Sequence, residues 1–265
     1  MRKLIYVCVF FMAGCSTRQV STTPIITDGT ITGSGKLFAT LYQQRAAEYR
    51  ALCFQAYNIA RYRLDGYQAQ TSKPKAIITD IDETVLDNSR YEAGRALLGK
   101  EYDQPSWYEW TAKGLADTMP GAVSFLKYAA SKGVTIFYIT NRDQKEREGT
   151  LKNLQRYNLP NADEAHLITR QNVSSKEVRR QSVHATHEIM MLLGDNLADF
   201  SALFDKKSVD ERLRNTNFSA ADFGSRFIVL PNPVYGDWET SLYNYNYKLT
   251  KPQKDSVIRK EVKAN

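Results

Sequence analysis

Two carboxylates, Asp80 and Asp82, stand two residues apart where the apolar run 75–79 ends. Residues at this spacing on an extended segment share a face, so both carboxylates should point towards one place. Such neighbouring anions repel each other unless a cation neutralises them. Asp195, which follows another apolar run at 189–194, adds a third carboxylate. Because Mg²⁺ prefers a few carboxylates together with water and phosphate oxygens, the pattern predicts a Mg²⁺ site at Asp80, Asp82 and Asp195.

This arrangement is suited to phosphoryl transfer, which needs an in-line nucleophile, a neutralised phosphate and a protonated leaving group. Asp80 can attack phosphorus and form an aspartyl-phosphate. Asp82 can protonate the leaving alkoxide and then activate the water that breaks the intermediate. We expect Thr140 to hydrogen-bond a phosphate oxygen, and Lys176 to hold phosphate and nucleophile by charge. The arginines at 179–180 are alternatives to Lys176, which is favoured.

The elements that must position these residues are short apolar strands alternating with helices, a pattern typical of a parallel sheet covered on both faces. The expected strands are 75–80, 133–140, 189–195 and 226–231, with a weaker candidate at 166–168. A helix should begin at Pro120 and end at Gly133. In open α/β sheets the carboxyl ends of parallel strands meet at one edge, where ligands bind. The sequence therefore predicts an α/β fold that gathers the candidate residues at this edge.

The N-terminus has the pattern of a targeting signal. A positive pair at 2–3, an apolar run at 4–12 and Ala13-Gly14-Cys15 follow the order of a secretory signal. The ending resembles the lipobox of bacterial lipoproteins, which implies cleavage of residues 1–14, a lipid on Cys15 and an outer-membrane location. Ser, Thr and Gly at 15–35 predict a flexible tether. A plain secretory signal is the alternative.

The remaining chain divides into one domain at 36–250 and a polar tail at 251–265. Helical spacing over 36–64 predicts one long helix or two shorter ones, and this segment is a candidate surface for a homodimer. Residues 86–118 lack a strong strand pattern and should form a mostly helical insertion above the site. The formal charge of +7 comes from scattered Lys and Arg, without a basic stripe that would indicate nucleic-acid binding.

Four motifs in order resemble those of the haloacid dehalogenase (HAD) superfamily: 80–84, 140–142, Lys176 and 194–199. The resemblance implies a Rossmann-like core with a cap insertion. It also implies that Asp82 binds the metal through its backbone carbonyl, and that Asp199 and Thr84 support the site from behind the ligands. The longer blocks 80–89 and 231–239 are similar to those of the class C acid phosphatases, which are bacterial lipoprotein 5'-nucleotidases.

That family resemblance implies Mg²⁺-dependent hydrolysis of nucleoside 5'-monophosphates, nicotinamide mononucleotide and aryl phosphates. Two aromatic rings flank the base in the family, and here they would be Trp107 and Tyr235, with Trp110 as a rival to Trp107. We also expect Asn141 and Arg142 to contact the substrate, although Arg142 could instead pair with acids. Two other readings stay open: a phosphatase for sugar phosphates or phosphotyrosine, and a surface binding or adhesion lipoprotein on an inactive phosphatase fold.

Overall fold

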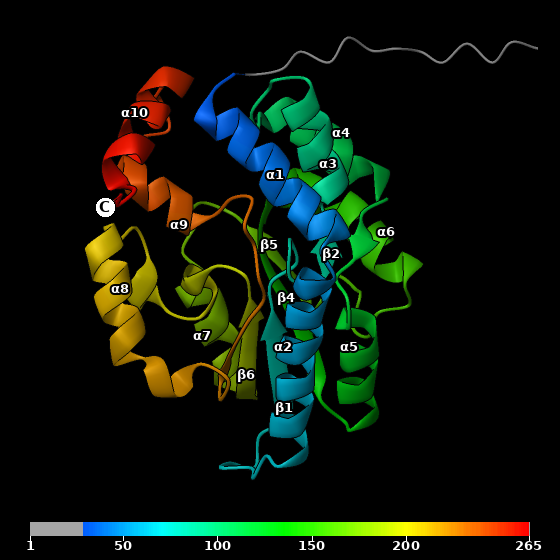
Figure 1. Ribbon diagram of the computed structural model, residues 1–265. Helices are drawn as coiled ribbons and strands as arrows, with labels where there is room; N and C mark the ends of the chain where they lie inside the picture. The colour runs from blue at the N-terminus through cyan, green and yellow to red at the C-terminus, as the bar shows by residue number, and fades with distance from the viewer. Residues whose placement is uncertain (1–28, 265) are drawn as a thin grey trace, which may run out of the picture.

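A five-stranded parallel sheet forms the centre of the computed structural model, which describes residues 29–264 (Figure 1). Its strand order is β5-β4-β1-β6-β7, so β1 is central and the chain crosses from one side of it to the other. The bounds are β1 Lys75–Thr79, β4 Thr135–Asp143, β5 Leu167–Arg170, β6 Glu188–Gly194 and β7 Phe227–Val229. The predicted α/β class is confirmed, and the weak strand candidate at 166–168 is β5.

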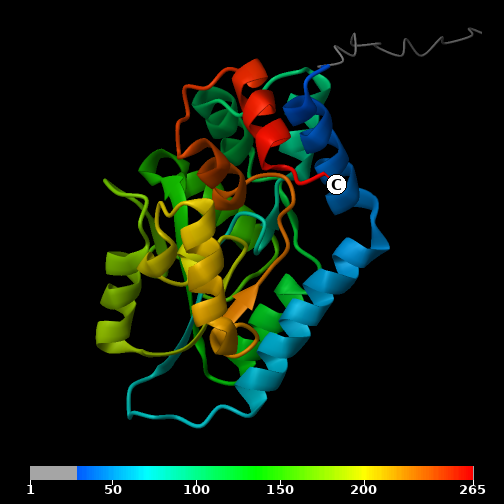
Figure 2. The same ribbon diagram turned by 60° about the vertical axis from the view of Figure 1, so that its left-hand side comes forward.

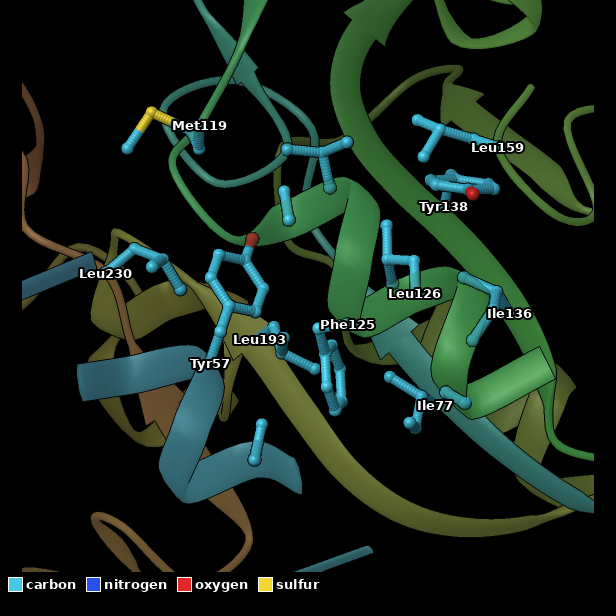
Figure 3. Packing of buried hydrophobic residues seen from close by; sticks show 14 of the residues in the cluster. Tyr57, Ile77, Met119, Phe125, Leu126, Ile136, Tyr138, Leu159, Leu193 and Leu230 are labelled. Atoms are coloured by element: carbon cyan, nitrogen blue, oxygen red, sulfur yellow. The ribbon is translucent and has the colours of Figure 1, made fainter. Parts of the chain in front are cut away.

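The side chains of β1 alternate between two apolar layers, because successive residues of a strand face opposite sides. Ile77 belongs to the larger cluster, under α2 (Ala47–Asp65) and α5 (Ala122–Ser131). Figure 3 shows this packing around Tyr57, Phe125 and Ile77. Ile78 faces the smaller cluster, which contains Val183 of α7 (Glu177–Thr186). Burial on both faces explains why the strand sequences are continuously apolar.

An insertion rises from the carboxyl edge of the sheet. It starts and ends with a two-stranded antiparallel ribbon, β2 (Leu86–Asp87) and β3 (Asp117–Thr118), and holds α3 (Ser89–Leu97) and α4 (Gln104–Lys113) between them. Asp103 caps α4 by accepting the N–H of Ser106 at 2.9 Å. The ribbon holds the two ends of the insertion together, so its helices stay fixed above the site. Further helices are α6 Arg147–Arg156, α8 Val209–Phe218 and α9 Asp237–Thr240.

The N-terminal helical segment is two helices, α1 (Ile31–Arg45) and α2, separated by Ala46 in an extended conformation. The tether predicted over 15–35 is wrong at its end, because α1 already begins at Ile31. Thr30 caps this helix by accepting the N–H of Gly33. Phe38 and Leu41 of α1 are exposed, which leaves dimerisation through this segment a prediction.

The polar tail predicted at 251–265 is also wrong in its first part, since residues Lys251–Glu261 form α10, which packs against α1 (Figure 2). The carboxylate of Asp255 accepts the N–H groups of Ile31 and Thr32 at 2.9 and 3.0 Å. An anion at these unsatisfied N–H groups stabilises a helix start. The local sequence around Ile31 or around Asp255 does not predict this contact, because the two residues are 224 positions apart in the chain.

The predicted signal at 1–14 and the predicted lipid site at Cys15 lie outside the described residues. Within residues 29–264, no helix combines the length and apolar character needed to cross a membrane.

Candidate active site

Three carboxylates, two buried and one half-buried, meet at the carboxyl edge of the sheet. Asp80 follows β1, Asp195 follows β6, and Asp199 lies in the turn after Asp195. One ligand oxygen from each lies within 4.8 Å of the other two. The Asp80 N–H is held by the carbonyl of Leu193 at 2.9 Å, so neighbouring strands fix the spacing. Hard oxygen donors at this spacing fit a divalent cation such as Mg²⁺.

Electrostatics in this cluster also favour a cation. Burial raises the pKa of Asp80 to about 7, and repulsion from Asp199 and Asp82 adds to the rise while Lys176 opposes it. Burial, with repulsion from Asp199 and Asp80, raises the pKa of Asp195 well above its ordinary value. These carboxylates are held together at a cost that a bound divalent cation would offset.

Lys176 lies between two of these acids. Its Nζ forms ion pairs with Asp80 and, at 2.7 Å, with Asp199. Burial lowers the pKa of Lys176, but the two carboxylates outweigh burial and raise it, so the amine stays charged. The alternatives Arg179 and Arg180 donate instead to backbone carbonyls, including those of residues 140 and 199. The structure thus brings Lys176 to Asp80, the predicted nucleophile.

Asp82 differs from the expectation that its carboxylate joins the metal cluster. The guanidinium of Arg142 binds it through Nη2 at 2.7 Å and Nε at 3.1 Å, and the Asn88 side chain donates to it at 2.8 Å. The side-chain cluster is therefore Asp80, Asp195 and Asp199, which moves Asp199 into the set of candidate ligands. An Asp82 side chain held in place by Arg142 is consistent with the proton transfer predicted for it, with Asp82 donating in its protonated form.

For Arg142, substrate contact and pairing with acids were both expected. Its side chain is buried, and besides Asp82 its Nη1 donates to Thr150 at 3.0 Å. Pairing with an acid is thus observed, and Arg142 positions Asp82. Arg142 also lines the cavity, with its Cζ 5.6 Å from the centroid of the Trp107 ring, so its contact with substrate stays a prediction.

Substituting Arg142→Ala should lower the free energy of unfolding by about 3 kcal/mol, because removing one partner of a buried ion pair leaves the other charge uncompensated. Turnover should fall as well, since Asp82 loses its support. Urea denaturation measures the first effect. Arg90→Ala is the matched control: this residue pairs with Asp117 at 2.8 Å on an exposed surface, where about 0–1 kcal/mol is expected. Equal losses in both variants would contradict the prediction.

Asn88 is a residue whose role the sequence did not reveal. It is fully buried and donates through Nδ2 to Asp82, while its Oδ1 accepts the indole N–H of Trp110 at 2.8 Å. Its backbone N–H binds Glu83 at 2.9 Å, and Glu83 in turn accepts the hydroxyl of Tyr235. Asn88 thus links Asp82, the predicted proton-transfer residue, through Glu83 to the loop that carries Tyr235. Its place in the block 80–89 was the only signal available.

Asp195 is supported by two neighbours. The Thr84 hydroxyl donates to one carboxylate oxygen at 3.3 Å, as the predicted supporting role of Thr84 requires. Asn232, which sequence reasoning left without a role, donates to the other oxygen at 2.7 Å. The Oδ1 of Asn232 accepts the N–H of Val234 at 3.0 Å, which fixes the turn before Tyr235.

Gly194 allows the Asp199 side chain to pack directly against the end of β6. A Cβ at Gly194 would lie 2.5 Å from the Asp199 side chain, so no other residue leaves room for this approach. The second Asp199 oxygen accepts the N–H of Asn196 at 3.0 Å and closes the turn.

Thr140 and Asn141 end the central part of β4 beside this cluster. Thr140 is fully buried, and its hydroxyl oxygen accepts the N–H of Arg142 at 3.1 Å. A hydroxyl can donate while it accepts, which is what binding a phosphate oxygen requires. Asn141 lines the cavity, and its Oδ1 accepts from Arg179 at 2.7 Å.

A cavity of about 640 Å³ opens above the carboxylates, beneath the insertion and α9. Trp107 and Tyr235 both line it, whereas Trp110 is turned to Asn88 and does not. This geometry selects Trp107 over its rival. Further aromatic residues of the cavity wall, unremarked in the sequence, come from the insertion and the C-terminal segment: Tyr102, Tyr243, Tyr245 and Tyr247.

Comparison with known proteins identifies this architecture. Residues 12–238 match the family model described as HAD superfamily, subfamily IIIB (acid phosphatase). The chain is similar to the class C acid phosphatase from Bacillus anthracis, with 42% identity and a TM-score of 0.85 over 88% of this chain and 99% of that one. A tungstate-bound structure of the B. anthracis enzyme gives the same identity and TM-score over 89% and 99%.

A more distant relative is the stem 31 kDa glycoprotein of Glycine max, which is 25% identical over 164 residues, or 60% of this chain. The match spans 58% of that relative's length. By the family model and the bacterial structures, the chain belongs to the class C acid phosphatases, phosphomonoesterases of subfamily IIIB of the HAD superfamily.

Proposed function

We propose that this chain is a Mg²⁺-dependent phosphatase for nucleoside 5'-monophosphates, held on a bacterial outer membrane by a lipid on Cys15. The observation that carries the catalytic part is the largely buried assembly of Asp80, Asp195, Asp199 and Lys176 beside an arginine-held Asp82. A surface lipoprotein on an inactive fold would have no reason to retain so costly a cluster of buried charges.

In the proposed reaction, an Asp80 oxygen attacks phosphorus as the bond to the leaving oxygen breaks, and Asp82 gives that oxygen a proton. Asp82 then takes a proton from the water that cleaves the aspartyl-phosphate and releases inorganic phosphate. Lys176 and the Thr140 hydroxyl neutralise and orient the phosphate oxygens. Asp80, Asp195 and Asp199 would hold the divalent cation, whose charge favours the developing anion in the transition state.

The nucleotide part of the proposal is supported by Trp107 and Tyr235 on the wall of the same cavity. The Tyr235 hydroxyl is held by Glu83, and the Trp107 ring packs edge-on against Tyr91 at 5.0 Å. Rings fixed in this way lose little entropy when a planar base stacks on them. A base stacked between them has no need of specific hydrogen bonds, which favours broad nucleotide use.

Trp107→Ala should raise KM for adenosine 5'-monophosphate roughly tenfold, since stacking on one ring contributes about 1–3 kcal/mol. KM for ribose 5-phosphate, which has no base, should stay nearly unchanged. Steady-state kinetics with both substrates measure the difference, and Tyr62→Ala, an exposed aromatic on α2, is the control. If wild-type protein turns over both substrates equally well, the stacking proposal is lost and a sugar-phosphate phosphatase becomes the better description.

The anchoring part rests on the sequence 1–15. Cys15→Ser should release the protein from the membrane fraction and abolish incorporation of labelled palmitate, while phosphatase activity persists in the soluble fraction. Retention of the variant in the membrane fraction would contradict lipidation as the anchor.

A further inference from the structure

Glu92, on α3, is a buried carboxylate that the catalytic assembly does not use. It is 8% exposed and lines the active-site cavity beside Lys36 of α1 and Glu239 of α9. Within residues 29–264 its carboxylate has neither a hydrogen bond nor an ion pair. Lys36, the basic group with the largest effect on it, pairs with Glu239 at 3.3 Å, and Arg95 pairs with Asp103.

The oxygens of Glu92 are not among the sealed side-chain atoms of the described residues that lack a partner, so they stay open to the cavity. Burial of the rest of the side chain and the nearby Glu239 carboxylate raise the pKa of Glu92, although Lys36 and Arg95 oppose the rise. Because no protein donor holds this carboxylate, it can accept a hydrogen bond from a molecule in the cavity.

Helix α3 determines where Glu92 lies relative to Asp82. Its N–H donates to the carbonyl of Asn88 at 3.2 Å, one turn earlier, and the Asn88 side chain contacts Asp82 at 2.8 Å. One helical turn spans about 5.4 Å. Glu92 therefore lies one helical turn from the residue that contacts Asp82, and both acids line the cavity that would take the leaving group.

The charge of the cavity narrows the chemistry of that leaving group. Eight carboxylate residues line the cavity against four basic ones, although the chain as a whole carries a formal charge of +7. One divalent cation beside Asp80 offsets only part of this excess. A second anion on the leaving group would be repelled, whereas neutral N–H and O–H donors or a cation would be attracted.

We propose that Glu92, with Lys36 and Glu239 beside it, forms a leaving-group subsite that accepts hydrogen bonds from neutral or cationic donors and rejects a second anion. The inference rests on the proposed phosphatase function and adds a specificity-determining residue to it. The donor is a sugar hydroxyl or a base amine, which present the same chemistry to a carboxylate.

The test compares Glu92→Gln with wild type on three substrates. For adenosine 5'-monophosphate, kcat/KM should fall roughly tenfold, mostly through KM, because a charged acceptor is lost. For p-nitrophenyl phosphate, whose leaving group has no donor, kcat/KM should stay within about twofold. Adenosine 3',5'-bisphosphate should be turned over better by the variant relative to the monophosphate. Glu109→Gln, an exposed residue of α4, is the matched control.

Two further nucleotides identify the donor. Inosine 5'-monophosphate lacks the base amine and 2'-deoxyadenosine 5'-monophosphate lacks one sugar hydroxyl. The nucleotide without the relevant donor should show no difference between Glu92→Gln and wild type.

Equal changes on all three substrates, or none, would overturn the subsite and leave Glu92 as an acid solvated by water. Thermal melting separates this from misfolding: the variant should melt at or above the wild-type temperature, because repulsion between Glu92 and Glu239 is removed. Absence of wild-type turnover even with p-nitrophenyl phosphate would overturn the phosphatase proposal itself and this inference with it. A subsite failure alone leaves that activity intact.

Discussion

Asp80→Asn should reduce turnover of p-nitrophenyl phosphate and of nucleotides by on the order of 10⁴-fold or more, as expected when the nucleophile of a covalent mechanism is removed. The amide has nearly the same shape but is a poor nucleophile. Lys176 keeps its contact with Asp199 at 2.7 Å, so the fold should survive. Single-turnover assays with trapped intermediate measure the effect, since wild type should accumulate phosphate on Asp80 and the variant should not.

The control is Asp210→Asn, an exposed aspartate in the first turn of α8. It removes the same charge far from the cluster and should leave turnover unchanged. Equal activity of Asp80→Asn and wild type would rule out Asp80 as the nucleophile.

Asp195→Asn should have the second large effect, a loss of turnover of about 10²-fold or more, because a ligand that stabilises developing charge is removed. The substitution should also change the thermal stability. In chelator the variant should melt at or above the wild-type temperature, since repulsion from Asp199 and Asp80 is relieved. Added Mg²⁺ should raise the melting temperature of wild type but not that of the variant.

The pH dependence of metal binding checks the same assembly. Burial raises the pKa of Asp80 to about 7 when no metal is bound, so protons and the cation compete for the carboxylate. Mg²⁺ should therefore bind more weakly as pH falls through about 7, and binding should release protons. Calorimetry in buffers of different ionisation enthalpy measures the release. Metal affinity independent of pH from 5 to 8 would contradict the assignment.

Much of the sheet could be predicted from the sequence, because strands buried on both faces must be continuously apolar. The runs before Asp80 and Asp195 carry this pattern, and their charged endings marked the edge where the site lies. The mostly helical character of the insertion was expected because residues 86–118 lack a strong strand pattern. By contrast, α10 was missed because its polar sequence shows no apolar stripe. Its docking depends on Asp255, which binds the start of a helix more than 200 residues away.

The candidate site divides in the same way. The types and order of Asp80, Lys176 and Asp195 identified the chemistry, because few other residues can supply a nucleophile, a cation and a metal ligand. The direction in which each side chain points could not be predicted from the sequence. Spacing alone put Asp82 in the metal cluster, but Arg142, 60 residues later, turns its carboxylate away.

The sequence by itself thus determined the reaction class, the sheet and the residues at its carboxyl edge, since these depend on residue type and on periodicity along one strand. The tertiary structure decided which carboxylates lie close enough to share a cation, that Trp107 rather than Trp110 faces the cavity, and that Glu92 is buried there without a partner. Each of these depends on contacts between segments that are separate in the sequence, such as that of Arg142 with Asp82. Such contacts form only when distant segments pack, and no local pattern records them.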